Sequence, residues 1–318
     1  MKKITTILAI LMLAIQFGWA QKADTAKLIV HYKFSHLRDT TQKDKPYTEN
    51  MVLFLAPTAS VYKSYDRKLQ QQMMQKQIAE QMADQKGSGQ LRINVQNRMQ
   101  TTNTEYFQFP AEGKFMRKER LITPYLIEEP MPAIKWEIST ETTKIGSMEC
   151  QKATAHFKGR DYTAWFTTEV PFHAGPWKLS GLPGLIVEAY DTNKEVVFKF
   201  DNMEEAVPFV KAAEATPTPG TPKLMMFGMD DANTDPNVIA VPTDAVKTTE
   251  KEFKNLQEAM RKDPNAFAQS AMAGSGMNLR AAPGGGAGGP GGPGGGMQIR
   301  MNGTGPVINN PLELPEKK

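Results

Sequence analysis

Hydrophobic and polar residues alternate along much of the chain between residues 28 and 200, with the period of two expected of strands that bury one face. Near the N-terminus, strand-forming residues gather in Leu28–Phe34, Asn50–Leu55 and Ser60–Lys63. The run Tyr162–Phe166 alternates in the same way. Short segments with Gly or Pro separate such runs, as turns do. Many short strands joined by turns predict an antiparallel sheet rather than strands that alternate with helices.

One early segment has a different pattern. Residues Asp66–Lys86 contain no Gly or Pro, are rich in Gln, Met and Lys, and place Leu69 and Met73 four positions apart. This spacing predicts a helix, which Gly87–Gly89 ends. Its methionines at helical spacing are expected to be core or contact residues: Met73, Met74 and Met82.

Beyond Phe200 the alternation weakens, and composition suggests the remaining divisions. Residues 248–272 predict a second helical segment, which Asp263-Pro264 must interrupt because proline breaks a helix interior. Pro283–Gly296 contains only Gly, Pro and one Ala, and we expect it to be disordered. The predicted divisions are 1–20 (signal peptide), 21–210 (β domain with the 66–86 helical insertion), 211–247 (linker and loops), 248–272 (helical) and 273–318 (Gly/Pro-rich, low-complexity tail).

These patterns together predict a mainly β fold of the α+β class. We expect a curved antiparallel sheet or half-barrel with one or two packed helices and a disordered Gly/Pro-rich tail. Trp165 and Phe166 are adjacent, so they point to opposite faces of their strand and make the sheet apolar on both sides. The second apolar face either contacts a ligand or partner, or is covered by helices.

The first residues predict export. Lys2 and Lys3 precede an apolar run, Ile4–Phe17, and the small residues Gly18 and Ala20 suit cleavage near Ala20, so the segment has the layout of a signal peptide. The run is shorter than the roughly 20 residues of a membrane span, and no later segment is apolar enough to cross a membrane. The mature chain is expected to be periplasmic or secreted, without a transmembrane span.

Charge and cysteine content exclude some classes of function. The chain has 38 Lys and Arg against 34 Asp and Glu, a net charge of +4, and its basic residues are spread out. The sequence therefore lacks the clustered basic residues that are typical of nucleic-acid-binding proteins. Cys150 is the only cysteine, so no intramolecular disulfide can form. It is expected to be a small buried hydrophobe, with a reactive or partner-linked thiol as the alternative.

Candidate catalytic residues are few, and we assign none. The four histidines are His31, His36, His156 and His173. Six residues of a regular strand separate Cys150 from His156, about 20 Å, which is too far for one metal ion or a nucleophile–base contact. No nucleotide-binding, hydrolase or metalloprotease motif occurs. A hydrolase with a site assembled from His173 and Glu169 is kept as an alternative.

Methionine is unusually frequent, with 19 residues in the chain. Met225, Met226 and Met229 lie close together in a weakly structured region, and thioethers are soft ligands suited to Cu(I). Copper binding is therefore an alternative to the expectation of no cofactor. Methionine also serves as adaptable apolar filler, which explains the same residues without a metal.

A Pro-Gly step marks the most informative motif, Gly181–Ile186, whose members are Gly181, Leu182, Pro183, Gly184, Leu185 and Ile186. Proline suits the first central position of a type II turn and glycine, with positive φ, the second, so we predict that turn at Leu182–Leu185. A strand is predicted to follow at Leu185–Tyr190. The motif, together with Ala164–Pro171 and Gly175–Trp177, resembles the GLPGLI family of secreted proteins from Bacteroidetes-type bacteria.

The resemblance implies export but no particular activity. It also suggests an outer-membrane transport receptor or another envelope protein as partner, and family members often carry a cysteine like Cys150. Trp136, Trp165 and Trp177 are expected to pack, although an exposed tryptophan would anchor a contact. Possible contact residues are Cys150, Trp165, Trp177 and His173. The preferred hypothesis is a non-enzymatic envelope protein that binds a protein partner or an apolar or peptide ligand through the curved sheet.

Overall fold

A computed structural model gives the fold of residues 23–84, 100–210, 235–274 and 308–316. Three predicted features lie outside these described residues: the signal peptide, the Met225, Met226 and Met229 group, and the Pro283–Gly296 segment.

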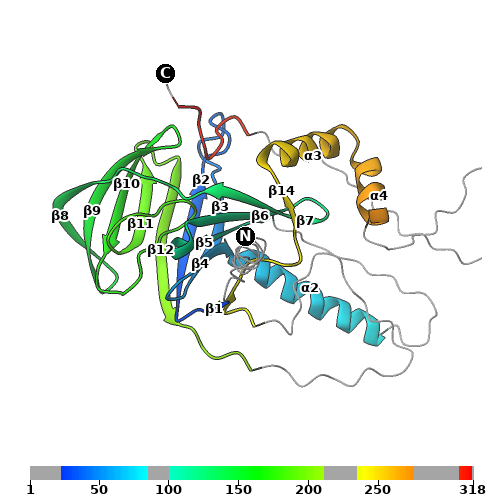
Figure 1. The fold of residues 1–318 in the computed structure, drawn as a ribbon, viewed down its shortest axis with the longest axis horizontal. Helices are drawn as coiled ribbons and strands as arrows, with labels where there is room; N and C mark the ends of the chain where they lie inside the picture. The colour runs from blue at the N-terminus through cyan, green and yellow to red at the C-terminus, as the bar shows by residue number, and fades with distance from the viewer. Residues whose placement is uncertain (1–22, 85–99, 211–234, 275–307, 317–318) are drawn as a thin grey trace, which may run out of the picture.

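Twelve strands of the described residues form one sheet, in the spatial order β14-β7-β6-β5-β4-β3-β2-β12-β11-β10-β9-β8 (Figure 1). Their bounds are β2 (Leu28–His36), β3 (Tyr47–Leu55), β4 (Ser60–Ser64), β5 (Thr104–Phe109), β6 (Lys114–Arg120), β7 (Pro124–Pro130), β8 (Glu137–Ile145), β9 (Met148–Phe157), β10 (Arg160–Thr167), β11 (Leu185–Asp191), β12 (Val196–Glu205) and β14 (Val246–Thr248). Neighbours are antiparallel except β14 and β7. The short strands β1 (Asp24–Thr25) and β13 (Val238–Ile239) pair with each other.

The mainly β, antiparallel architecture predicted from the sequence is confirmed, and the sheet is open rather than closed into a barrel. The three N-terminal runs of strand formers lie in β2, β3 and β4, and the run after the Pro-Gly step forms β11. Strands β8–β12 stand together at one side of the molecule, while β5–β7 run across toward the C-terminal helices (Figure 1).

Helix α2 (Tyr65–Asp84) corresponds to the helix predicted at residues 66–86. The Ser64 hydroxyl accepts the N–H of Arg67 at 3.0 Å, and the Asp66 carboxylate accepts the backbone N–H of Asn50 at 2.8 Å. The first bond joins the first turn to the end of β4, and the second joins it to β3. Farther along, the helix extends away from the sheet (Figure 1), and Met73 is 64% exposed. Of the two roles expected for Met73, core or contact residue, the core position is therefore wrong, because this part of the helix extends away from the sheet.

Helices α3 (Glu250–Lys262) and α4 (Pro264–Gly274) follow β14, and the break between them is at the Asp-Pro step that the sequence contains. Thr249 and Glu252 form a capping box at the start of α3, which satisfies two otherwise free N–H groups. Phe253 is buried and packs edge-on against Tyr125 of β7, with ring centroids 5.8 Å apart. The helical segment is thereby attached to the sheet at the β14 edge.

The larger apolar core lies inside the curve of the sheet. It joins residues of β2–β4 and β9–β12 with side chains from the 168–184 loop, which follows β10. Trp177 of this loop is 1% exposed, and its ring stacks on Phe198 of β12 with centroids 6.3 Å apart. The loop therefore fills the curve with the chain's own side chains. The preferred hypothesis allowed a ligand to bind against an open inner wall, but Trp177 already occupies that space.

A second apolar core lies on the other face of the sheet. Along β3, Leu53 and Leu55 belong to the first core while Val52 and Phe54 belong to the second, because successive side chains of a strand point to opposite faces. Ile239 of β13 also packs into the second core. The sheet is apolar on both faces, as expected, but the residues on which that expectation rested do not show it. Phe166 belongs to the first core and Trp165 packs against the same core, because a register shift between them interrupts the alternation.

The Gly181–Ile186 motif has a different conformation from the one predicted. Gly181, with φ of +93°, adopts positive φ, and Gly184 does not, so the type II turn with Gly184 at its second central position is wrong. Glycine is required at position 184 for another reason. A Cβ there would lie 2.1 Å from the carbonyl oxygen of Thr167. The motif thus lets two backbone segments come together where β10 ends and β11 begins.

We predict that Gly184→Ala is strongly destabilising, because even one methyl group would meet backbone that cannot rotate away. The expected loss is about 3 kcal/mol in the free energy of unfolding, at the upper end of overpacking changes. Gly113→Ala is the matched control: Gly113 has φ of +63°, and a Cβ added there would meet nothing within 4 Å, so the change carries only the left-handed backbone cost of roughly 1–2 kcal/mol. Urea denaturation of both variants measures the difference, and equal losses would contradict the close-approach explanation.

Candidate functional site

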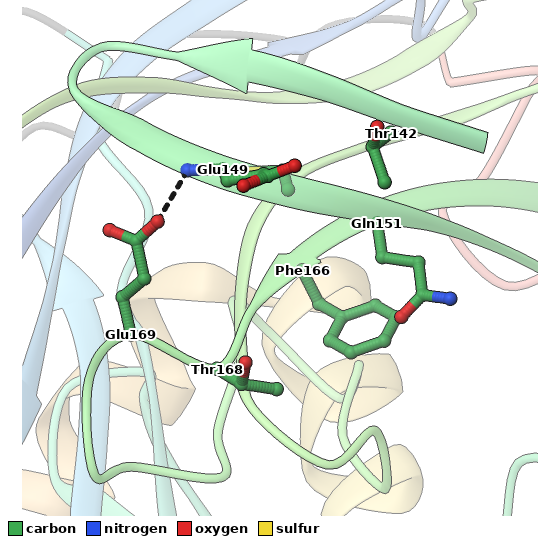
Figure 2. A pocket seen from close by; sticks show the side chains of 7 residues that line it. Thr142, Glu149, Gln151, Phe166, Thr168 and Glu169 are labelled. Atoms are coloured by element: carbon green, nitrogen blue, oxygen red, sulfur yellow. Dashed lines mark hydrogen bonds between the residues drawn. The ribbon is translucent and has the colours of Figure 1, made fainter. Parts of the chain in front are cut away.

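Two surface hollows border the same part of the chain, where β10 ends and the 168–184 loop begins. The first, the edge hollow, has a volume of about 230 Å³ and lies against strands β8 and β9 (Figure 2). Its lining residues are Thr142, Glu149, Cys150, Gln151, Phe166, Thr168 and Glu169. The second, the loop hollow, has a volume of about 260 Å³.

The edge hollow exists because β10 does not extend along the first residues of β9. The pairing of β10 with β9 ends at Phe166 and Gln151, and beyond this point the first residues of β9 have no strand on that side. The Glu169 carboxylate takes the place of a strand there: it accepts the backbone N–H of Glu149 at 2.7 Å (Figure 2). A side chain from the loop thus completes the hydrogen bonding of β9, and the space between them remains open.

The lining of the edge hollow is polar and carries negative charge. Glu149 and Glu169 are both exposed there, as are Thr142 and Thr168. Burial raises the pKa of nearby Glu188. The hollow is therefore suited to a polar or positively charged group rather than to an apolar one.

Cys150 is one of the residues that line this hollow, but it is not an activated nucleophile. Its side chain is fully buried, and burial raises the thiol pKa to about 11, with the negative charges of Glu169 and Glu188 acting in the same direction. Activated cysteines need the opposite, a lowered pKa beside a positive charge. The thiol remains protonated at neutral pH, in agreement with the expectation of a small buried hydrophobe.

The loop hollow contains His173 but no catalytic constellation. Its lining is mostly apolar or backbone, from Leu55, Ala56, Pro57, Thr58, Ala59, Ser60, Pro110, Ala111, Pro171, Phe172, His173 and Ala174. Glu169 lines the other hollow, and within the described residues no hydrogen bond joins it to His173. The two residues of the hydrolase alternative are therefore not brought into one site.

The remaining candidate residues have structural positions. Trp165 is half-buried against the first core and Trp177 is fully buried, so neither tryptophan is an exposed contact anchor. Trp136 donates its indole N–H to the carbonyl oxygen of Ser180 at 2.8 Å. Among the described residues, no three His, Cys, Asp or Glu side chains are grouped to hold a metal ion. No helix of the described chain is long and apolar enough to cross a membrane.

Sequence reasoning missed most of the edge hollow. Glu149 is adjacent to Cys150 in the sequence, yet nothing in that pair indicates that the carboxylate faces open space. Thr142 and Thr168 lie on separate segments whose meeting depends on where β10 stops pairing. Only the exposed, polar character of the segment 137–145 was a usable signal for a free sheet edge.

The part of the chain that matches a known protein family lies in this same region. Residues 157–188 match the model of the family described as "Protein of unknown function (Porph_ging)", a Bacteroidetes-type family. The matched stretch contains β10, the loop with Trp177 and the Pro-Gly motif, and it contributes to the lining of both hollows.

No curated protein matches the chain. Among solved structures, the chain is similar to PNGF-II in the C2 space group, with a TM-score of 0.43 and 11% identity over 72% of this chain and 32% of that one. The P21 form of PNGF-II gives a TM-score of 0.43 and 10% identity with the same coverage. The chain thus spans about a third of the length of those proteins.

We predict that Cys150 does not react with a thiol reagent in the folded protein. At pH 8 a pKa of about 11 leaves less than about 1% thiolate, and the sulfur is also buried. Treatment with DTNB should give no colour within minutes in buffer, and one equivalent in 6 M guanidinium chloride. Rapid stoichiometric reaction of the native protein would show that the thiol is accessible and would contradict this assignment.

Proposed function

We propose that the protein is a non-enzymatic, exported protein of the bacterial envelope that binds a partner protein by strand addition at β8. The incoming segment is extended and basic, and one of its Lys or Arg side chains enters the edge hollow. The supporting observation is that this acidic hollow is lined from β8 and β9, directly beside a free sheet edge.

Strand β8 has the backbone groups that such binding needs. It is the last strand of the sheet on its side, and within the described residues it pairs only with β9. Seven of its nine residues are exposed. The outer N–H and C=O groups of such an edge strand can pair with another chain, which is the basis of recognition by strand addition.

The edge hollow supplies the specificity that main-chain bonding lacks. In strand addition, affinity comes from backbone hydrogen bonds and selectivity from pockets for alternate side chains. Thr142, which lines the hollow, belongs to β8 itself, and the side chains of Glu149 and Glu169 give the hollow negative charge. A basic side chain on the added strand would reach this charge, whereas an acidic one would be repelled.

Other features of β8 limit unselective pairing. Its pairing with β9 is irregular between Ile138 and Thr142, and it carries the charged residues Glu137, Glu141 and Lys144. Bulges and charges of this kind protect edge strands from aggregation. The stretch from Thr142 to Ile145 pairs regularly with β9, and the hollow lies beside it. This stretch is therefore the part of β8 at which we expect the partner strand to pair.

We predict that a labelled peptide with the sequence Thr-Val-Thr-Val-Lys-Val-Thr-Val-Thr binds the protein, and that its central Lys→Glu counterpart does not. Glu149→Gln and Glu169→Gln should each weaken binding about threefold, the size expected of one exposed charge pair. Gln at position 169 keeps an oxygen that can accept the N–H of Glu149, so the local backbone is preserved. Fluorescence anisotropy measures the dissociation constants.

Glu205→Gln is the control for net charge, because Glu205 is exposed on β12 and does not line the hollow. A Lys peptide methylated on alternate backbone nitrogens tests the main-chain bonds and should lose binding. Equal binding of the Lys and Glu peptides, or of the methylated peptide, would rule out charge-selective strand addition at β8.

A further inference from the structure

The C-terminal segment 308–316, which we call the strap, lies against a different part of the molecule from the edge hollow. It crosses the end of β2 and the turn between β9 and β10 (Figure 1, red). The surface beneath it, the strap groove, is formed by residues that lie more than 100 positions earlier in the chain: His36, Leu37, Arg38, His156, Lys158, Arg160, Lys178 and Glu195.

Asn310 is the anchor of the strap, and the groove bonds each of its polar atoms. Its amide Nδ2 donates to the carbonyl oxygen of Leu37 at 2.8 Å and to the Glu195 carboxylate at 2.9 Å. Its Oδ1 accepts from Arg160 at 2.6 Å. Only asparagine offers both a donor and an acceptor here in this size, and the residue is 5% exposed. The groove therefore contains an asparagine-specific pocket.

The main chain around Asn310 is bonded as well. Its N–H donates to the carbonyl oxygen of Arg38 at 3.0 Å, and its carbonyl oxygen accepts from His36 Nε2 at 2.9 Å. Burial, with Arg38 nearby, lowers the pKa of His36 to about 4, so the neutral ring supplies this donor at physiological pH. Arg160 donates to the carbonyl oxygens of Pro311 and Leu312 at 2.8 and 3.1 Å.

The acidic side chains of the strap meet basic side chains of the groove. Glu313 pairs with Lys178 at 2.7 Å and with Lys158 at 3.2 Å. Glu316 pairs with His156 at 2.8 Å. Lys178 is buried, and it is shared between Glu313 and Glu129 of β7. Recognition thus depends on an Asn, a carboxylate three residues later, and main-chain bonds between them.

These contacts are those of a peptide bound in a groove, since the segment forms no helix or strand of its own and is bonded through both its backbone and its side chains. We propose that the strap groove is a recognition site for an acidic segment of a partner protein with the pattern Asn-x-x-Glu, and that the strap is its built-in occupant. Residues 275–307 lie between α4 and the strap in the sequence. This proposal concerns a different surface from β8 and does not depend on strand addition there.

The strap and the groove belong to one chain, so the strap competes intramolecularly. Such a segment acts at an effective concentration on the order of mM, so a partner displaces it only when it binds more tightly or is present at a comparable local concentration. The intact chain is therefore held in a closed state. Weakening the strap without touching the groove should open the site to a peptide added in solution.

The test uses the full-length chain carrying Asn310→Asp. This change removes the donor to Leu37 and places a second carboxylate beside Glu195, so the strap should leave while the groove is unaltered. A labelled synthetic peptide with the sequence of residues 306–318 is then titrated by anisotropy. We expect binding to the variant, and binding about 100-fold weaker to the wild-type chain because its own strap competes.

Two controls make the result specific. The same peptide with Asp in place of Asn310 should fail to bind the Asn310→Asp chain, and the Pro315→Ala chain, changed at an exposed strap residue, should behave as wild type. Glu313→Lys provides a second opened chain in case Asn310→Asp lowers the melting temperature enough to prevent measurement. Failure of the peptide to bind either opened chain, or equal binding to wild-type and opened chains, would overturn the proposal.

Sedimentation velocity of the wild-type chain shows whether a second copy can be the occupant. Concentration-dependent dimers that Asn310→Asp abolishes would support the groove and identify the strap of another copy as its ligand. A dimer that persists in Asn310→Asp, together with no peptide binding by that variant, would overturn the proposal.

Discussion

A wide curved sheet has an apolar inner face that must be filled, and Trp177 is the largest of the loop side chains that fill it. Its ring stacks on Phe198 and lies near Tyr162, so a single side chain joins β10 and β12 across the curve. The backbone at Trp177 has φ of +55°, a left-handed conformation that costs a non-glycine residue about 1–3 kcal/mol. Burial of so large a ring can offset that cost. Because the inner face is filled by the chain itself, the two proposed binding surfaces lie at an edge of the sheet and at the ends of its strands.

The second constraint is the buried charge of Arg160. Its guanidinium is 3% exposed and is neutralised by Asp191 at 2.6 Å and Glu195 at 3.3 Å, while its other N–H groups face the strap. A buried charge is tolerated only when it is paired and fully hydrogen-bonded, and losing a partner costs about 3–5 kcal/mol. Asp191 also accepts the N–H groups of Glu195 and Val196, which shapes the turn into β12. The same arginine thus holds together a turn of the sheet and the last described segment of the chain.

Much of the fold could be predicted from the sequence because alternation reports local burial. The strands from β2 to β4, the curved antiparallel sheet and the helix at α2 all follow from periods of two and of about four. What could not be predicted depends on contacts between distant segments. The sequence suggests that Gly184 is needed for a turn. In the structure, glycine is needed at this position because the backbone of Thr167 comes too close for a Cβ atom. Met73 has helical spacing but no surface to cover. Asn310 lies 150 residues from its partner Arg160, in a region whose composition predicts disorder, so no local pattern could identify it as an anchor.

The strap is held by bonds to both its main chain and its side chains. Arg38 and Lys158 accept strap N–H groups with their carbonyl oxygens, Arg160 donates to strap carbonyls, and one side-chain pocket selects asparagine. Affinity from the main chain with selectivity from a pocket is the same physical arrangement as the free edge of β8 beside the acidic hollow. The two sites differ in charge: the groove is basic and takes an acidic segment, and the hollow is acidic and suits a basic one. Neither arrangement calls for an activated nucleophile, and the raised pKa of Cys150 keeps the thiol beside the hollow protonated. Both surfaces are therefore proposed as sites for a polypeptide segment.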